Sequence, residues 1–168
     1  MKTRRNYSFA KASRLINQII AENLNMMANY QNEAIQAGID NKRDINGKSY
    51  VPLSEDSTLP IRNARKQGFT PLDRMKGARQ KKLRNTKILR ATQKDLTSKI
   101  KMTTDYGVFH NQGFTTSPKS MIPSQKVPAR NWFGISTEMR PKGRKYKVFV
   151  RMAMMKIKQS LRKYADTR

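Results

Sequence analysis

Cysteine is absent from this chain of 168 residues, and histidine occurs once, as His110. The absence of cysteine excludes disulfide bonds, thiolate zinc sites and cysteine nucleophiles. A single histidine excludes a histidine-rich metal site, and any Ser-His-Asp triad would have to use that one residue. No uninterrupted apolar run approaches the ~18 residues that a membrane-spanning helix needs, so we expect no membrane segment.

Acidic residues are also scarce, since 11 Asp and Glu stand against 36 Lys and Arg, which gives a formal net charge of +25. An excess of this size predicts a polyanionic neighbour, which could be nucleic acid, an acidic protein surface or anionic lipid. Apolar residues make up 36% of the chain, below the ~45–50% of an ordinary globular domain. We therefore expect one domain over residues 1–168 with a small core that a partner completes.

Sequence patterns of catalysis are missing as well. Neither phosphate-cradling glycine pattern, GxxxxGK[ST] or GxGxxG, is present. The triplet Gly134-Ile135-Ser136 does not continue into a nucleophile elbow, because Thr137-Glu138 follows it. An isolated histidine is more often a hydrogen-bonded structural residue than a catalyst. The sequence thus predicts no enzyme, no cofactor and no metal site.

Two long helices are predicted at the ends of the chain. Apolar residues recur at steps of three and four from Leu15 to Ile35, which indicates a helix over residues 9–37 with Gly38 just after its end. The acid-free, arginine-containing start also fits a mitochondrial presequence, although the periodicity continues beyond the length of one. Residues 145–151 alternate briefly as a strand would, but helical spacing from Tyr146 to Tyr164 favours a helix over 144–165.

The middle of the chain separates into a loop region and a predicted sheet. Closely spaced Gly, Pro, Asn and Ser predict an extended loop region over residues 38–87. Its basic end is a candidate surface for partner contact, with a solvated or disordered loop as the alternative. The candidate contact residues are Arg79, Lys81, Lys82, Arg84, Lys87 and Arg90.

Residues 88–136 are predicted to form the sheet core. Leu96, Ile100 and Met102 alternate with polar residues, which is typical of a half-buried strand. Tyr106, Val108 and His110 share one face of a second predicted strand. Residues 127–135, which hold the only tryptophan, return as a third strand-like segment.

Short segments spread over about residues 40–136 carry a family resemblance. They read INGKSYVPLS (45–54), KILRAT (87–92), YGVFHNQG (106–113) and VPARNWFGIS (127–136). In this order they resemble the tailed-phage virion morphogenesis family, the Mu-type tail-completion and head–tail joining proteins. The chain departs from the family pattern at Tyr50, where the family usually has tryptophan, and at Asn131, where it has proline.

The resemblance implies an α+β subunit with a small antiparallel sheet flanked by helices. It implies no catalysis, a homo-oligomeric ring in the neck or tail end, and a place in the virion after assembly in the host cytoplasm. The implied partners are further copies and adjacent virion proteins, namely head-completion or adaptor proteins and tail proteins. The motif residues implied to pack or to form the subunit interface are Tyr50, Pro52, Leu89, Thr92, Tyr106, His110, Gly113, Pro128, Arg130, Trp132, Phe133 and Gly134.

Within that picture we expect individual roles for five of these residues. Tyr106 and His110 would fix the sheet to the loop end, and Trp132 and Phe133 would be packing anchors. Arg130 would pair with a carboxylate or a carbonyl, in the same subunit or in the next. Ordinary packing inside one domain is the alternative for all five.

The excess of positive charge has two interpretations within the phage resemblance. The basic residues would dock on acidic faces of neighbouring virion proteins, which we favour, or would contact DNA in a channel. A different function also fits the composition, that of a basic nucleic-acid-binding protein of ribosomal or nucleoid type. Against it, the sequence holds no RNP-type aromatic-glycine motif and no GXXG loop.

Overall fold

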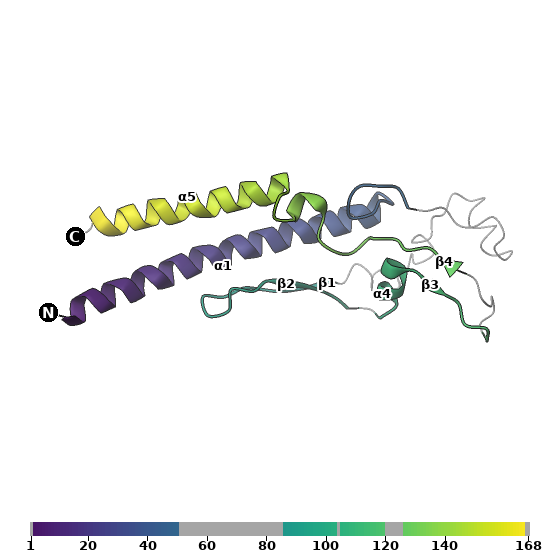
Figure 1. The fold of residues 1–168 in the computed structure, drawn as a ribbon, viewed down its shortest axis with the longest axis horizontal. Coiled ribbons are helices and arrows are strands. Elements are labelled where there is room, and N and C mark those ends of the chain that lie inside the picture. Colours follow the sequence, from purple (N-terminus) through teal and green to yellow (C-terminus); the bar gives the residue numbers. More distant parts are fainter. Residues whose placement is uncertain (1, 51–85, 104, 120–125, 167–168) are drawn as a thin grey trace. The chain divides into compact units, whose positions relative to one another are not determined.

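The computed structural model describes residues 2–50, 86–103, 105–119 and 126–166 (Figure 1). Its elements are, in chain order, α1 (Lys2–Asp40), β1 (Thr86–Leu89), β2 (Lys99–Met102), α4 (Asp105–Gln112), β3 (Phe114–Thr115), β4 (Lys126–Val127), the 3-10 turn η2 (Thr137–Met139) and α5 (Arg144–Asp166). β1 pairs with β2, and β3 pairs antiparallel with β4, with Phe114 opposite Val127. The predicted α+β class is confirmed.

The chain divides into two compact units. Unit 1 consists of Met1–Gln31, Ile88–Ile100 and Thr137–Arg168. Unit 2 consists of Asn32–Lys87 and Lys101–Ser136. Helix α1 and the β1–β2 sheet each contribute residues to both units.

Helix α1 is longer than the 9–37 predicted, and Gly38 lies inside it instead of following it. The helix ends at Asp40, and Lys42 just after it has the left-handed backbone angle φ of 58°. Arg43 N donates to Gly38 O at 2.8 Å, and Lys42 N donates to Ile39 O, which together form a Schellman cap. A Cβ on Gly38 would lie 2.9 Å from Arg43 O. Glycine therefore serves here to let the returning chain approach the last turn.

Unit 1 is held by amide side chains of α1 that reach the loop between β1 and β2. Asn25 brackets Ala91, because its Nδ2 donates to Ala91 O at 3.0 Å and its Oδ1 accepts from Ala91 N at 2.8 Å. About two turns before Asn25, Asn17 and Gln18 make longer, exposed hydrogen bonds to Gln93. The loop itself closes through Thr92, whose N and Oγ1 both bond to the backbone of Asp95.

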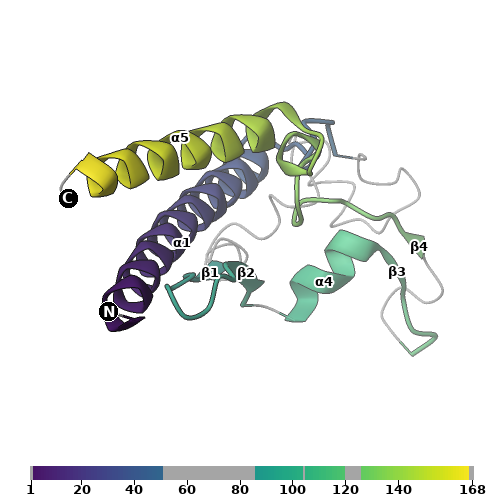
Figure 2. The ribbon, with the colours of Figure 1, turned by 60° about the vertical axis from the view of Figure 1, so that its left-hand side comes forward.

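Helix α5 spans 144–166, which confirms the prediction of 144–165. It returns antiparallel to α1, and the two helices diverge toward the C-terminus of α5 (Figure 2). Near the start of α5, Asn23 Nδ2 donates to Phe149 O at 2.6 Å. The Tyr30 ring meets the Phe149 ring edge-on. Lys145 Nζ lies 5.3 Å from the centroid of the Tyr30 ring. None of the described helices combines the length and apolarity that crossing a bilayer requires.

The predicted sheet core over 88–136 is wrong in its second strand. Tyr106, Val108 and His110 belong to the helix α4 and not to a strand. The strand around Ile100 and Met102 is confirmed as β2, with those two side chains half-buried between exposed lysines. Of the third predicted strand over 127–135, only Val127 pairs, as part of β4, and residues 128–136 run as irregular chain. The strands of the described residues form two sheets of two strands each.

We predict that Asn25→Ala destabilises unit 1 by about 2–3 kcal/mol, because it leaves a part-buried backbone donor and acceptor of Ala91 without partners. Urea denaturation followed by far-ultraviolet circular dichroism measures this loss. Asn17→Ala is the matched control, since its bond to Gln93 O is exposed and 3.4 Å long, and it should change stability by less than about 0.5 kcal/mol. Equal losses in the two variants would contradict the bracket.

Candidate functional site

A tight turn after α1 brings Tyr50 into unit 2. Asp44 Oδ1 accepts hydrogen bonds from Asn46 N at 2.9 Å and Lys48 N at 2.8 Å, which is the Asx-turn arrangement. Gly47 takes the positive φ of 84° that this turn requires. The chain then runs back beside the end of α1, where Tyr50 N donates to Lys42 O at 3.2 Å. Tyr50 is only 8% exposed.

The irregular segment 130–133 joins this turn to α4. Ile45 N donates to Asn131 O at 2.8 Å on one side, and Arg130 N donates to His110 O at 2.9 Å on the other. Phe133 N also donates to the Asn111 side chain at 3.0 Å. Three segments that lie far apart in the sequence therefore meet at residues 130–133.

Trp132 forms the buried centre of this junction. It is 1% exposed, and its Nε1 donates to Gly107 O at 3.3 Å. Its ring meets Phe133 edge-on at 5.6 Å between centroids. A buried indole N–H needs an acceptor, and the carbonyl of Gly107 in α4 supplies one. The tryptophan thus fixes α4 to the segment that follows β4.

Gly113 lets the chain leave α4 close to that same segment. Its φ is 75°, and a Cβ at this position would lie 2.7 Å from Ala129 N and 2.8 Å from Val127 O. Any side chain here would force the backbone of 127–129 to move. Phe114, which follows directly, places its ring edge-on to both His110 and Phe109, with centroids 6.0 Å apart in each pair.

Three titratable groups lie in the junction, of which Tyr50 and Arg130 are buried and His110 is half-buried. Burial lowers the pKa of the Arg130 guanidinium, while Tyr50 acts in the opposite direction. Burial and the nearby Asp44 carboxylate raise the pKa of the Tyr50 hydroxyl. Burial and the Arg130 charge lower the pKa of His110. Arg130 Nη1 lies 3.5 Å from His110 Nδ1. Because a guanidinium can only donate, a hydrogen bond between these two atoms requires Nδ1 to carry no proton.

The arrangement joins segments of the chain through buried side chains. Arg130, Tyr50 and Trp132 are all under a tenth exposed, and burial, which raises the pKa of Tyr50, keeps its hydroxyl protonated. No group of three or more metal-ligating side chains occurs within the described parts of the chain. We therefore describe the site as a structural junction, here called the motif junction, formed by Asp44, Tyr50, His110, Asn111, Gly113, Arg130, Trp132 and Phe133.

The structure brings together most of the motif residues that the sequence singled out. Tyr50, His110, Gly113, Arg130, Trp132 and Phe133 lie in the motif junction, and Pro128 and Gly134 flank them on the same segment. Gly134 has a φ of 149°. Tyr106 lies in α4, but its side chain is outside the described part of the structure.

Other predicted residues lie elsewhere. Leu89 and Thr92 belong to unit 1, where Leu89 O accepts from the Ser98 hydroxyl and Thr92 closes the turn to Asp95. Lys87 and Arg90 are exposed, on β1 and directly after it. Pro52, Arg79, Lys81, Lys82 and Arg84 lie outside the described residues.

Sequence reasoning left two junction residues without a role. Asp44 precedes Asn46-Gly47, and an acidic residue just before an Asn-Gly pair is a signal for the Asx-turn that it forms. Asn111 stands within the motif around His110, but nothing in the sequence indicates that its side chain accepts from Phe133 N.

Apolar side chains remain exposed beside the motif junction. Val108 and Phe109 of α4 are 43% and 55% exposed, and Ile135, which follows Gly134, is 60% exposed. Each belongs to a segment that the junction holds in place. The junction therefore has an apolar border that the described part of this chain leaves uncovered.

We predict that the stability of unit 2 falls as the pH drops below about 6.5, because the folded state lowers the pKa of His110. The unfolded state then binds more protons in this range, so stability is fully present at higher pH and is lost as the pH falls through the folded pKa. Amide hydrogen exchange in 107–113 and 130–133 measures the effect. His110 is the only histidine, so His110→Gln should abolish the dependence between pH 5.5 and 7.5, roughly the range of an ordinary histidine. An unchanged slope in that variant would contradict the assignment.

We also predict that Trp132→Ala destabilises unit 2 by about 3–5 kcal/mol, since it empties a fully buried indole site and removes the bond to Gly107 O. Faster hydrogen exchange in 43–49 and 107–113 would report the loss. Val108→Ala removes a side chain that is 43% exposed on the same helix α4, and should change stability by less than about 1 kcal/mol. If 43–49 stays protected in Trp132→Ala, the tryptophan does not hold the turn.

Comparison of the chain with protein-family models, with curated proteins and with solved structures gives no match.

Proposed function

We propose that this protein is a structural subunit of a tailed-phage virion, which forms a ring at the neck or tail end and joins head to tail. The observation that carries the proposal is the convergence of three motif segments, 45–50, 107–113 and 127–134, on one hydrogen-bonded junction. The fourth segment of the resemblance, 87–92, lies almost entirely in unit 1.

The distribution of apolar side chains supports a subunit over a self-sufficient globule. Among the described residues, nine hydrophobic side chains are buried, while eleven large ones are exposed. Those beside the motif junction are Val108, Phe109 and Ile135. Large exposed apolar groups in one region usually mark an interaction site. A neighbouring copy would cover this border, and a contact between unlike faces closes into a ring when its rotation permits.

The positive charge supports partners of opposite sign. The chain has 36 Lys and Arg and only 11 Asp and Glu. The excess cations repel one another within the chain and between copies. Contact with acidic faces of head-completion, adaptor or tail proteins would offset that repulsion. DNA in the channel is the second destination for the charge. The phosphate contacts of a conduit must allow passage, which disfavours a strongly cationic lining.

We predict that the purified chain assembles into particles of several times 19.5 kDa, measured by size-exclusion chromatography with light scattering. The double variant Phe109→Ser, Ile135→Ser should reduce assembly, because it removes apolar area from the uncovered border. Phe9→Ser is the matched control, since it changes an aromatic that is 79% exposed in unit 1 and should leave assembly intact. Negative-stain microscopy would show the rings.

A strict monomer at micromolar concentration, together with the absence of the chain from purified phage particles, would overturn the proposal. Binding to random duplex DNA at two salt concentrations separates the alternative function. Strong binding at low salt by a chain that does not assemble would indicate a basic nucleic-acid-binding protein of ribosomal or nucleoid type, because phosphate contacts weaken steeply with salt. Weak binding at both concentrations agrees with the virion role.

A further inference from the structure

Only part of the apolar face of helix α5 is buried against the rest of unit 1. Tyr146, Phe149, Ala153 and Ile157 follow helical spacing and are half-buried. A second apolar row lies next to them on the helix surface and is exposed. Its members Val150, Met154 and Leu161 are 36%, 65% and 36% exposed.

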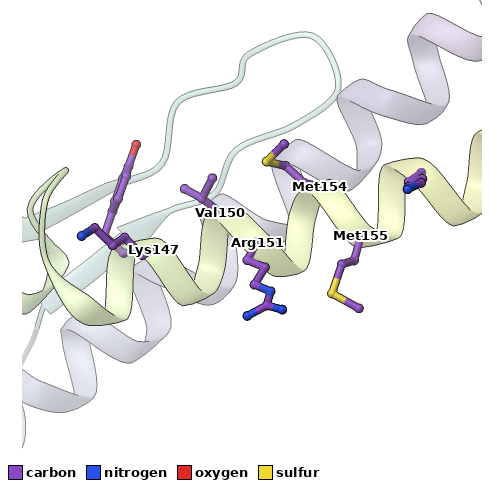
Figure 3. Close-up of a pocket in the computed structure, with 7 residues that line it drawn as sticks. Lys147, Val150, Arg151, Met154 and Met155 are labelled. Atoms are coloured by element: carbon purple, nitrogen blue, oxygen red, sulfur yellow. The ribbon is translucent and has the colours of Figure 1, made fainter.

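A row of cations runs beside the exposed apolar row. Lys147, Arg151 and Lys158 each stand three residues before one of its members, so the two rows follow the helix in parallel. Between them lies a shallow hollow of about 530 Å³. In Figure 3, Val150 and Met154 project from one side of α5, and Arg151 and Met155 project from the other. The two rows together are called the α5 strip.

We propose that the α5 strip binds an amphipathic helix of a partner protein, one whose apolar row is flanked by Asp or Glu. The apolar row of the strip would pack into that helix, and Lys147, Arg151 and Lys158 would pair with its carboxylates. Docking of a helix on such a surface uses anchors spaced by three, four and seven residues, and Val150, Met154 and Leu161 are spaced by four and seven. Met154 can adjust to partners of different shape, because its side chain is unbranched and polarisable.

The positive charge of α5 requires a partner of negative charge. Residues 144–166 contain eight Lys or Arg and a single acid, Asp166. Antiparallel or parallel contact between two copies of α5 would oppose cation to cation along the whole row. A second copy therefore cannot satisfy the strip, although copies can still meet through the border of the motif junction. An acidic helix satisfies both rows at once.

The side chains that α5 leaves exposed favour a partner helix over a lipid bilayer or DNA. The centre of the apolar arc of α5, around Ala153 and Ile157, is half-buried within unit 1 and is not open to a partner. Outside the strip, Val148, Met152 and Met155 are also exposed, on the other side of the cationic row. A helix that lies on a bilayer presents its whole apolar face to the lipid. A helix that binds DNA phosphates needs cations but gains nothing from exposed Val150 and Met154. Within the strip, the apolar row of Val150, Met154 and Leu161 beside the cationic row fits one face of a single partner helix.

The inference concerns α5 alone and does not depend on a ring or a virion. The test uses the full chain in solution and a synthetic helical peptide with a Leu row flanked by Glu, followed by fluorescence anisotropy of the labelled peptide. Binding should weaken about tenfold in Lys147→Glu, Lys158→Glu, since each reversal opposes a carboxylate of the peptide. It should weaken by about tenfold or more in Val150→Ser, Met154→Ser, through loss of apolar burial.

The matched control makes the same change of charge outside the strip. Lys142 and Lys156 are exposed, one before α5 and one on a different side of it, so Lys142→Glu, Lys156→Glu should alter binding by no more than about twofold. All substituted side chains are exposed, and an unchanged circular dichroism spectrum checks that the variants fold. A peptide with Lys in place of Glu should not bind.

Three results would overturn the proposal. The first is no binding of the acidic peptide by the folded chain. The second is an equal loss in the strip and control variants, which would mean that net charge alone attracts the peptide. The third is a dependence on Val150 and Met154 that appears with vesicles of phosphatidylglycerol and phosphatidylcholine, or with duplex DNA, and not with the peptide. A failure of ring assembly alone would leave this inference standing.

Discussion

The burial of Trp132 against the backbone of α4 is the interaction on which unit 2 depends. β3 and β4 are two residues long each, and a hairpin of that size has little stability of its own. The unit is instead held by single hydrogen bonds that converge on residues 130–133, from the turn at Ile45 and from His110 and Asn111 of α4. Since Trp132 occupies the centre of these bonds, its removal would separate segments that the described strands do not join in one sheet.

Much of the fold could be predicted from the sequence, and the errors have physical causes. The two long helices follow from apolar spacing, because only a helix satisfies it over many turns. α4 was predicted as a strand because Tyr106, Val108 and His110 alternate, and eight residues are too few for the helical period to outweigh that pattern. Gly38 was expected after the helix, where glycine is common, but its task is close approach to Arg43 O. That task depends on a tertiary contact which the sequence does not display.

In the motif junction too, the sequence predicts some features, whereas others depend on tertiary contacts. Tyr50, His110, Arg130 and Trp132 could be chosen from their order along the chain, and they do lie together. Their partners could not be chosen, because these are mostly backbone carbonyls and amides, such as Gly107 O and Asn131 O, that any residue type would supply. Likewise the apolar spacing of α5 predicts a buried face but not which half of it remains uncovered, since that depends on how the helix is rotated against its neighbours.

The position of the only tryptophan has a practical consequence. Trp132 lies in unit 2, whereas α5 and most of α1 lie in unit 1. Intrinsic indole emission therefore observes one unit, and backbone ellipticity observes mainly the other. Coincident transitions from the two signals would mean that the units melt as a single cooperative body, and separated transitions would mean that each has its own melting point. The chain carries its own pair of independent reporters without any label.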